Sequence, residues 1–158
     1  MPKAIVVHEF GGPEQLRWEE HDAGEPGPGQ VRVFLRAAGL NFIDVYFRTG
    51  VYGAQVPFTP GLEASGVVEA VGDGVSDLSI GDRVAYAGPP AGAYSEERLM
   101  PAHQVVKLPD GVSDEMAAAM MLKGMTARYL LRQTYRVNAG DTILFHAAAG
   151  GVGLIACQ

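Results

Sequence analysis

The sequence contains a single cysteine, Cys157, and no long hydrophobic run. One cysteine excludes an internal disulfide framework and a thiolate cluster for zinc. The four histidines are scattered and show none of the spacings of metal ligands. Spanning a bilayer takes about 20 apolar residues, and the apolar run near the N-terminus, residues 4–7, is far shorter and followed by charge. We therefore expect a soluble, cytoplasmic protein without a signal peptide.

Positive charge is also scarce, with 12 Lys and Arg against 18 Asp and Glu and a formal net charge of −6. This balance disfavours nucleic acid and anionic membrane surfaces as partners. Oriented backbone dipoles can still hold an anionic cofactor. Apolar residues are plentiful: 47% of the 158 residues are hydrophobic, enough for the core of one domain, or of one domain and part of another.

The first hundred residues have the pattern of short strands separated by turns and loops rich in glycine and proline. Candidate strands cover residues 4–7, 16–20, 31–39, 64–71, 80–86, 93–100 and 104–108. We expect the first two to pair as a hairpin, with Leu16 and Trp18 on one face. Strands at this spacing are typical of a barrel or a sandwich.

Two stretches have the apolar spacing of helices. Residues 42–47 predict a short helix, and Asn41 precedes them as a candidate N-cap. Residues 116–135 are rich in Ala, Met and Leu. Because glycine is a poor helix former, we expect Gly124 to separate two helices there, around 114–121 and 126–134.

The last stretch has the pattern of a strand, a turn and a helix. Residues 143–145 are apolar, a turn of Ala and Gly follows, and apolar residues resume at 152–156 with helical spacing. In dinucleotide-binding domains such a turn lets the backbone approach a pyrophosphate, whose charge the helix N-terminus favours. Taken alone, the turn could equally be structural. The chain ends within this helix, so we expect half of a cofactor site.

Several motifs together resemble one family. Gly140-Asp141, Leu144 and the run 148–153 are similar to the signature of the zeta-crystallin-like quinone oxidoreductase branch of the medium-chain dehydrogenases/reductases. The segments 38–44, 60–66, 71–72, 81–84 and 122–127 agree with it in the same order. Family members have about twice this length, so the resemblance implies the N-terminal half of an enzyme.

The resemblance implies a fold and a reaction. The fold is a β-rich GroES-like barrel domain, residues 1–124, followed by a helical bridge and the truncated start of an α/β Rossmann domain, residues 125–158. The reaction is NADPH-dependent reduction of quinones by hydride transfer, in a cleft between the two domains. Zinc-dependent relatives place a His after the Pro-Gly pair, where this chain has Leu62, and a Cys near Asn41, so the implied enzyme needs no metal.

Alternatives remain open at this point. The same fold could reduce α,β-unsaturated ketones or enoyl thioesters, or it could bind NADPH as a non-catalytic structural relative. The resemblance also implies a homodimer for the full-length protein, and we expect the isolated half to be inactive.

The implied catalytic residues are Asn41, Tyr46 and Tyr52, whose amide and phenol groups could donate hydrogen bonds to a carbonyl oxygen that gains charge. Each has a structural alternative, as a helix N-cap for Asn41 and as packing for the tyrosines. The implied cofactor-binding residues are Asn41, Phe42, Ile43, Tyr46, Lys123, Thr126, Ala149, Gly150, Gly151, Val152 and Gly153.

Further expectations concern single residues. Thr126, at a helix start, would cap the helix or touch the nicotinamide, and Lys123 would face a phosphate or solvent. Glu63 is expected to be a structural hydrogen-bond acceptor, and Cys157 to be buried and inert. Bulk at Gly151 or Gly153 is expected to weaken cofactor binding more than folding.

Overall fold

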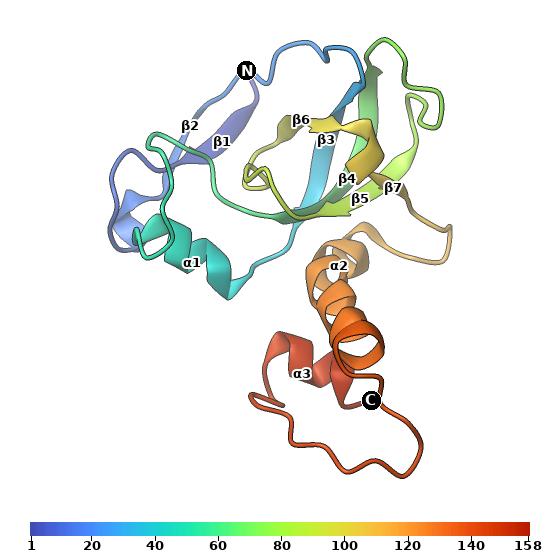
Figure 1. Cartoon of the computed structure of the whole chain (residues 1–158). Coiled ribbons are helices and arrows are strands. Elements are labelled where there is room, and N and C mark those ends of the chain that lie inside the picture. The colour runs from blue at the N-terminus through green and yellow to red at the C-terminus, as the bar shows by residue number, and fades with distance from the viewer.

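The computed structural model describes residues 1–158, which form a β-rich domain followed by a helical extension (Figure 1). In chain order the main elements are β1 (Lys3–Val6), β2 (Arg17–Glu20), β3 (Gln30–Ala38), α1 (Phe42–Arg48), β4 (Glu63–Val71), β5 (Arg83–Ala87), β6 (Glu97–Pro101), β7 (Val106–Lys107), α2 (Asp114–Tyr129), a π-helical turn (Leu130–Thr134) and α3 (Gly151–Ala156). Short 3-10 turns cover Pro13–Gln15 and Ala102–Gln104.

Five strands form one antiparallel sheet in the order β6-β3-β4-β5-β7. Along β3, Val31, Val33 and Leu35 are buried while the residues between them are not, because successive side chains of a strand point to opposite faces. They pack in one core whose other members include Val68 and Tyr86. The predicted β-rich core is therefore confirmed.

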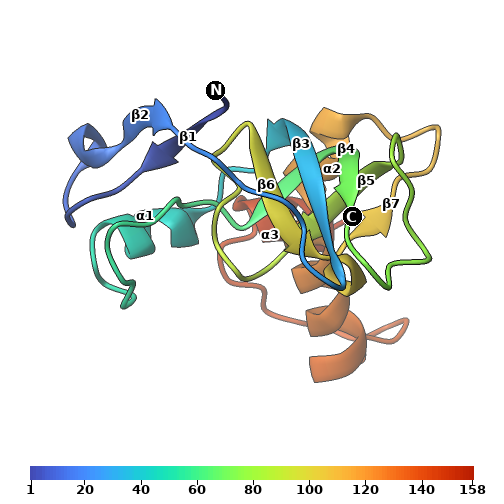
Figure 2. The same ribbon diagram turned by 90° about the horizontal axis from the view of Figure 1, so that it is seen from above.

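The other two strands, β1 and β2, form the predicted hairpin, in which Ile5 lies opposite Trp18. Seen from above, this hairpin lies with α1 to one side of the five-stranded sheet (Figure 2). Isolated bridges from Ala4 to Ser95 and from Val7 to Phe58 connect it to the rest of the domain. The helix predicted at residues 42–47 is α1, and the later predicted strands form with shorter bounds.

The predicted division of the helical region at Gly124 is wrong, because α2 continues through this residue. A glycine costs roughly 1 kcal/mol in a helix interior. That cost is offset at the start of α2, where the Ser113 side chain accepts a hydrogen bond from Met116 N–H, and along its length, where Ala117 and Ala127 are buried. The proposed domain boundary at 124/125 consequently falls inside one continuous helix.

The strand predicted at residues 143–145 is also not formed, since this stretch is irregular. Ile143 is 44% exposed and Leu144 is 84% exposed. A strand exists only through hydrogen bonds to a neighbour, and no other strand of this chain lies beside it. The helix predicted after the turn does form, as α3, and Cys157 at its end is exposed rather than buried. None of the helices combines the length and apolar character that crossing a membrane would require.

Candidate active site

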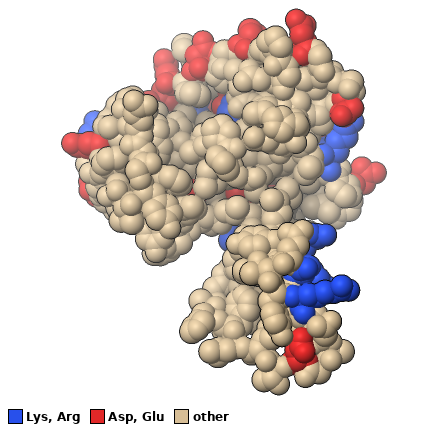
Figure 3. Space-filling model, in the orientation of Figure 1, with Lys and Arg blue, Asp and Glu red and all other residues tan.

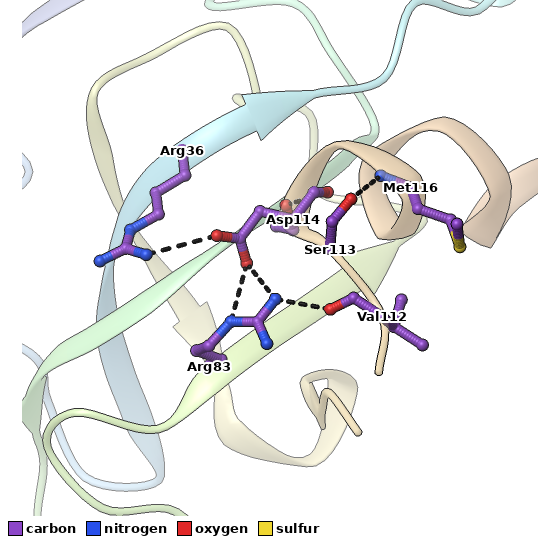
Figure 4. A network of polar contacts seen from close by, with 7 residues as sticks. Arg36, Arg83, Val112, Ser113, Asp114 and Met116 are labelled. Carbon is purple, nitrogen blue, oxygen red and sulfur yellow. Dashed lines mark hydrogen bonds and ion pairs between the residues drawn. The ribbon is translucent and has the colours of Figure 1, made fainter. Parts of the chain in front are cut away.

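The N-terminal end of α2 is fixed to the sheet by Asp114 (Figure 4). Its carboxylate accepts hydrogen bonds from Arg83 on β5, at 3.1 and 3.3 Å, and from Arg36 on β3, at 3.4 Å. The Ser65 hydroxyl on β4 donates to the backbone carbonyl of Asp114 at 2.6 Å. Three neighbouring strands thus hold the first turn of α2, which sets the direction in which the helix leaves the sheet.

Glu63, the first residue of β4, lies at the centre of the candidate site and is fully buried. Its Oε2 accepts a hydrogen bond from the side-chain amide of Asn41 at 2.7 Å and lies 3.2 Å from the Lys123 ammonium. Its Oε1 accepts the backbone N–H of Leu122 at 2.7 Å. Burial of a carboxylate is costly unless it is paired, and here three donors from the two helical segments pair it.

Glu63 is therefore the structural acceptor expected from the sequence, and its role is specific: it joins the start of α1 to the middle of α2. The Lys123 ammonium faces this carboxylate rather than solvent alone, and its predicted contact with a phosphate stays a prediction.

Gly39 permits this junction. A side chain on Gly39 would overlap the backbone carbonyl oxygen of Ala118 in α2 and the carboxylate of Glu63. The missing side chain lets α2 approach the end of β3. The sequence contained no local signal for this role, because the contact partners lie far along the chain.

Asn41 is buried and serves as the N-cap of α1, in an extended conformation. Its backbone N–H donates to the carboxylate of Asp44 at 3.0 Å, while its side-chain amide donates to Glu63. The structural alternative for Asn41 is thus realised. An amide nitrogen carries two hydrogens, so its predicted catalytic role is compatible with this contact and stays a prediction.

Asp44 and Tyr94 form a buried pair that sequence reasoning missed. Oδ2 of Asp44 accepts the Tyr94 hydroxyl at 2.8 Å, and its buried Oδ1 has no hydrogen-bond partner. Burial raises the pKa of Asp44, and the hydrogen bond from Tyr94 opposes this shift. Burial, and then Asp44 itself, raise the pKa of Tyr94, so the phenol stays protonated. An acidic residue three positions after an N-cap was the available signal.

The predicted aromatic residues gather on α1 and the loop after it. The ring of Tyr46 lies 5.2 Å from that of Phe42 and 5.2 Å from that of Tyr52, measured between centroids. Phe42 is 71% exposed, Tyr52 47% and Tyr46 36%. Ile43, which is half-buried, is not part of this cluster. Exposed rings in edge-to-face and tilted contact offer an apolar surface that also carries phenol hydroxyls.

The remaining predicted residues lie around the turn before α3. A cavity of about 330 Å³ is lined there by Thr126, Leu130, Phe145, His146, Ala147, Gly150, Gly151, Val152 and Gly153. Ala149 belongs to the turn without lining the cavity. The backbone N–H groups of Gly151, Val152 and Gly153 have no hydrogen-bond partner in the chain. These N–H groups are free to bind an anion.

Two expectations about this turn are corrected. Thr126 lies in the interior of α2, not at a helix start, and its hydroxyl donates to the Leu122 carbonyl at 2.7 Å. A side chain on Gly153 would overlap the carbonyl oxygens of Ala147 and Ala148. Bulk at Gly153 must therefore also disturb the folding of the turn itself, which the expectation from the sequence did not include.

The charges are distributed unevenly between the two parts of the chain. Fifteen of the 18 acidic residues fall within residues 1–110. In Figure 3, acidic side chains are spread over the β-rich domain, whereas Lys and Arg side chains gather along one side of the part that contains α2 and α3. Most of the negative charge of the chain therefore belongs to the β-rich part, and little of it to the part that contains α2 and α3. No group of three or more His, Cys, Asp or Glu side chains is arranged to hold a metal ion.

Comparison with known proteins adds independent observations. Residues 27–110 match the model of the alcohol dehydrogenase GroES-like domain. A quinone oxidoreductase of Pseudomonas aeruginosa is 56% identical over 100% of this chain and 49% of its own length. A 2-haloacrylate reductase of a Burkholderia species is 50% identical over 98% of this chain and 48% of its own.

A solved structure gives the same picture. The quinone oxidoreductase of Escherichia coli, complexed with NADPH, superposes with a TM-score of 0.95 at 46% identity, covering 98% of this chain and 48% of that one. The chain thus spans about half the length of the relatives it matches.

Proposed function

The chain belongs to the alcohol dehydrogenase GroES-like domain family, and within it to the quinone oxidoreductase branch of the medium-chain dehydrogenases/reductases. We therefore propose that it is part of an enzyme that reduces quinones with NADPH. The resemblance seen in the sequence and the GroES-like fold are thereby confirmed. The activity, substrate and cofactor of the whole protein are proposals.

The observation that carries the proposal is the turn of small residues before α3. Its free N–H groups at Gly151, Val152 and Gly153, and the cavity beside them, fit the pyrophosphate of a dinucleotide. When bound, NADPH would supply the hydride. Thr126 borders the same cavity and would limit where the rest of the cofactor lies.

The aromatic cluster of α1 would form the substrate side of the site. The exposed face of Phe42 suits a planar ring, and the phenols of Tyr46 and Tyr52 could donate hydrogen bonds. As hydride reaches the ring, negative charge develops on a carbonyl oxygen, and donors placed at that oxygen stabilise it. The second amide hydrogen of Asn41 is a further candidate donor.

Two features support a reaction without metal. Leu62, at the position where zinc-dependent relatives have a His, is buried and cannot ligate a cation. Both oxygens of the neighbouring Glu63 are occupied by donors from the protein. The charge on the substrate oxygen would then be balanced by hydrogen bonds alone.

The test is NADPH oxidation by a protein of the relatives' full length, with 1,4-naphthoquinone and with an α,β-unsaturated ketone as acceptors. We expect faster turnover with the quinone, and a larger loss of kcat in Y46A than in Y46F if the ring is the main contribution. The 2-haloacrylate reductase at 50% identity favours conjugated carbon–carbon double bonds as the second candidate substrate, which faster enone reduction would support.

Tight NADPH binding without turnover on either acceptor would instead indicate the non-catalytic alternative. We propose that the isolated chain is inactive, since it spans only about half the length of the relatives it matches. A homodimeric full-length protein and a cytoplasmic location are proposals that rest on the family.

A further inference from the structure

The three glycines of the turn differ in what a side chain would meet. At Gly150 and Gly153 the neighbouring atoms belong to the turn itself, the carbonyl of Ala147 in both cases and that of Ala148 for Gly153. At Gly151 all three nearest atoms belong to the stem of Lys123: Cδ at 2.8 Å, Cε at 3.0 Å and Cγ at 3.6 Å from where Cβ would be. Gly151 is therefore the one turn glycine restricted by a side chain from another element.

The stem of Lys123 has little freedom to move away. Its ammonium is 3.2 Å from Oε2 of Glu63, whose carboxylate is fully buried. The same carboxylate is held by Asn41 and by the Leu122 backbone. A lysine whose charged end is fixed in this way cannot swing aside without leaving a buried carboxylate short of its charged partner.

We propose that Glu63 positions the glycine turn through Lys123, and that Gly151 lacks a side chain because the stem of this lysine occupies its space. Glu63 and Lys123 are positioning residues that link the five-stranded sheet to the start of α3. The importance of the link for cofactor binding rests on the proposed function, whereas the link itself does not.

The proposal has a consequence that a purely phosphate-binding role of Gly151 lacks. A methyl group at residue 151 must push Lys123 away and so weaken its pairing with Glu63. G151A and the loss of the Lys123 ammonium then act on one contact, and their effects must be non-additive. Once the ammonium is gone, alanine should even favour α3, because it is a better helix former than glycine.

The experiment measures hydrogen exchange of the α3 amides in the 158-residue chain, with Leu154 and Cys157 as reporters because their N–H groups donate to Gly150 and Gly153. The variants are G151A, K123M and their combination, since methionine keeps an unbranched stem without charge. We expect G151A to accelerate exchange about tenfold when Lys123 is present, and not to accelerate it in the K123M background. A tenfold change corresponds to the loss of about one hydrogen bond to a charged group.

The matched control is G153A, whose methyl group meets only the carbonyls of the turn. It should accelerate exchange equally in both backgrounds. E63Q removes the same ion pair from the other side and should also abolish the effect of G151A. Amides in the core of the five-stranded sheet serve as the internal reference for folding. The proposal would be overturned if G151A accelerated exchange of the α3 amides equally in the presence of Lys123 and in the K123M background. It would also be overturned if G151A caused no acceleration while Lys123 is present.

A second readout tests the connection to the cofactor. In a protein of the relatives' full length, G151A should raise the KM for NADPH more with Lys123 than in the K123M background, while kcat changes less than KM. If that protein does not oxidise NADPH, the proposed function fails, and hydrogen exchange still decides whether Lys123 positions the turn.

Discussion

The side-chain amide of Asn41 donates a hydrogen bond to the Glu63 carboxylate at 2.7 Å. The residue predicted to act on a substrate therefore also holds two buried parts of the protein together. The bond links the N-cap of α1 to the first residue of β4. The aromatic cluster on α1 therefore has a fixed position relative to α2, which Glu63 holds through Leu122 and Lys123.

The first prediction concerns N41D. This change keeps an N-cap side chain but places a second carboxylate against Glu63, replacing a donor by a like charge. We expect the free energy of unfolding in urea to fall by about 2–3 kcal/mol at pH 7, the range for a lost hydrogen bond to a charged group, and by less at pH 5. N41S, which also keeps the cap, is the control, and its effect should not depend on pH. A penalty for N41D that is the same at both pH values would contradict the proximity of the two groups.

The second prediction concerns G39A. Its methyl group would overlap a backbone carbonyl of α2 and the fixed carboxylate of Glu63, neither of which can rotate away. Overpacking costs about 1–3 kcal/mol, and we expect the upper end, measured by urea unfolding. G124A is the matched control: only Met120 Cε, at 3.8 Å, is near, so alanine should stabilise α2 by roughly 1 kcal/mol. If the two changes had the same sign, the close approach at Gly39 would be refuted.

Local sequence signals were sufficient for the elements that form locally. The α1 helix was predictable because Asn41 and the apolar spacing after it lie within a few residues of each other. The β1-β2 hairpin and the strands of the five-stranded sheet were predictable for the same reason, since alternation and turn residues are local. Only their ends shifted, by a few residues.

The errors occurred where distant contacts decide the outcome. Gly124 does not end the helix, because Asp114 and Glu63 anchor α2 to the sheet on either side of Ala118. Residues 143–145 do not form a strand without a neighbouring strand. The candidate site was predicted as a set of separate residues, and the sequence could not show that Glu63 connects two of them, because only the fold brings Asn41 and Lys123 to one carboxylate.

The third prediction concerns the pH dependence of stability at Asp44. Burial raises its pKa in the folded state, with the charge of Glu63 acting in the same direction and the hydrogen bonds from Tyr94 and Asn41 and the charge of Lys123 opposing it. A carboxyl group whose pKa is raised by folding contributes stability below its ordinary pKa, and this contribution is lost as pH rises through the folded pKa. In D44N the group no longer titrates, so the stability of D44N relative to the natural protein should increase from acid to neutral pH.

Urea unfolding at a series of pH values measures this difference. Y94F is the informative companion, because it removes the hydrogen bond that lowers the pKa of Asp44 and should move the transition to higher pH. A difference between D44N and the natural protein that stays constant with pH would exclude a raised pKa at Asp44.

The last prediction concerns the anchoring of α2 by Asp114 (Figure 4). Arg83 both pairs with Asp114 and donates to the Val112 carbonyl at 2.6 Å, whereas Arg36 makes one longer contact with Asp114 and its side chain is 52% exposed. Exposed ion pairs contribute about 0–1 kcal/mol and are screened by salt. We therefore expect R36A to cost less than about 1 kcal/mol and its effect to disappear in high salt. R83A should cost about 1–3 kcal/mol, because the loss of its hydrogen bonds persists. The measurement is urea unfolding at low and high sodium chloride, and a larger loss for R36A than for R83A would show that α2 is anchored differently.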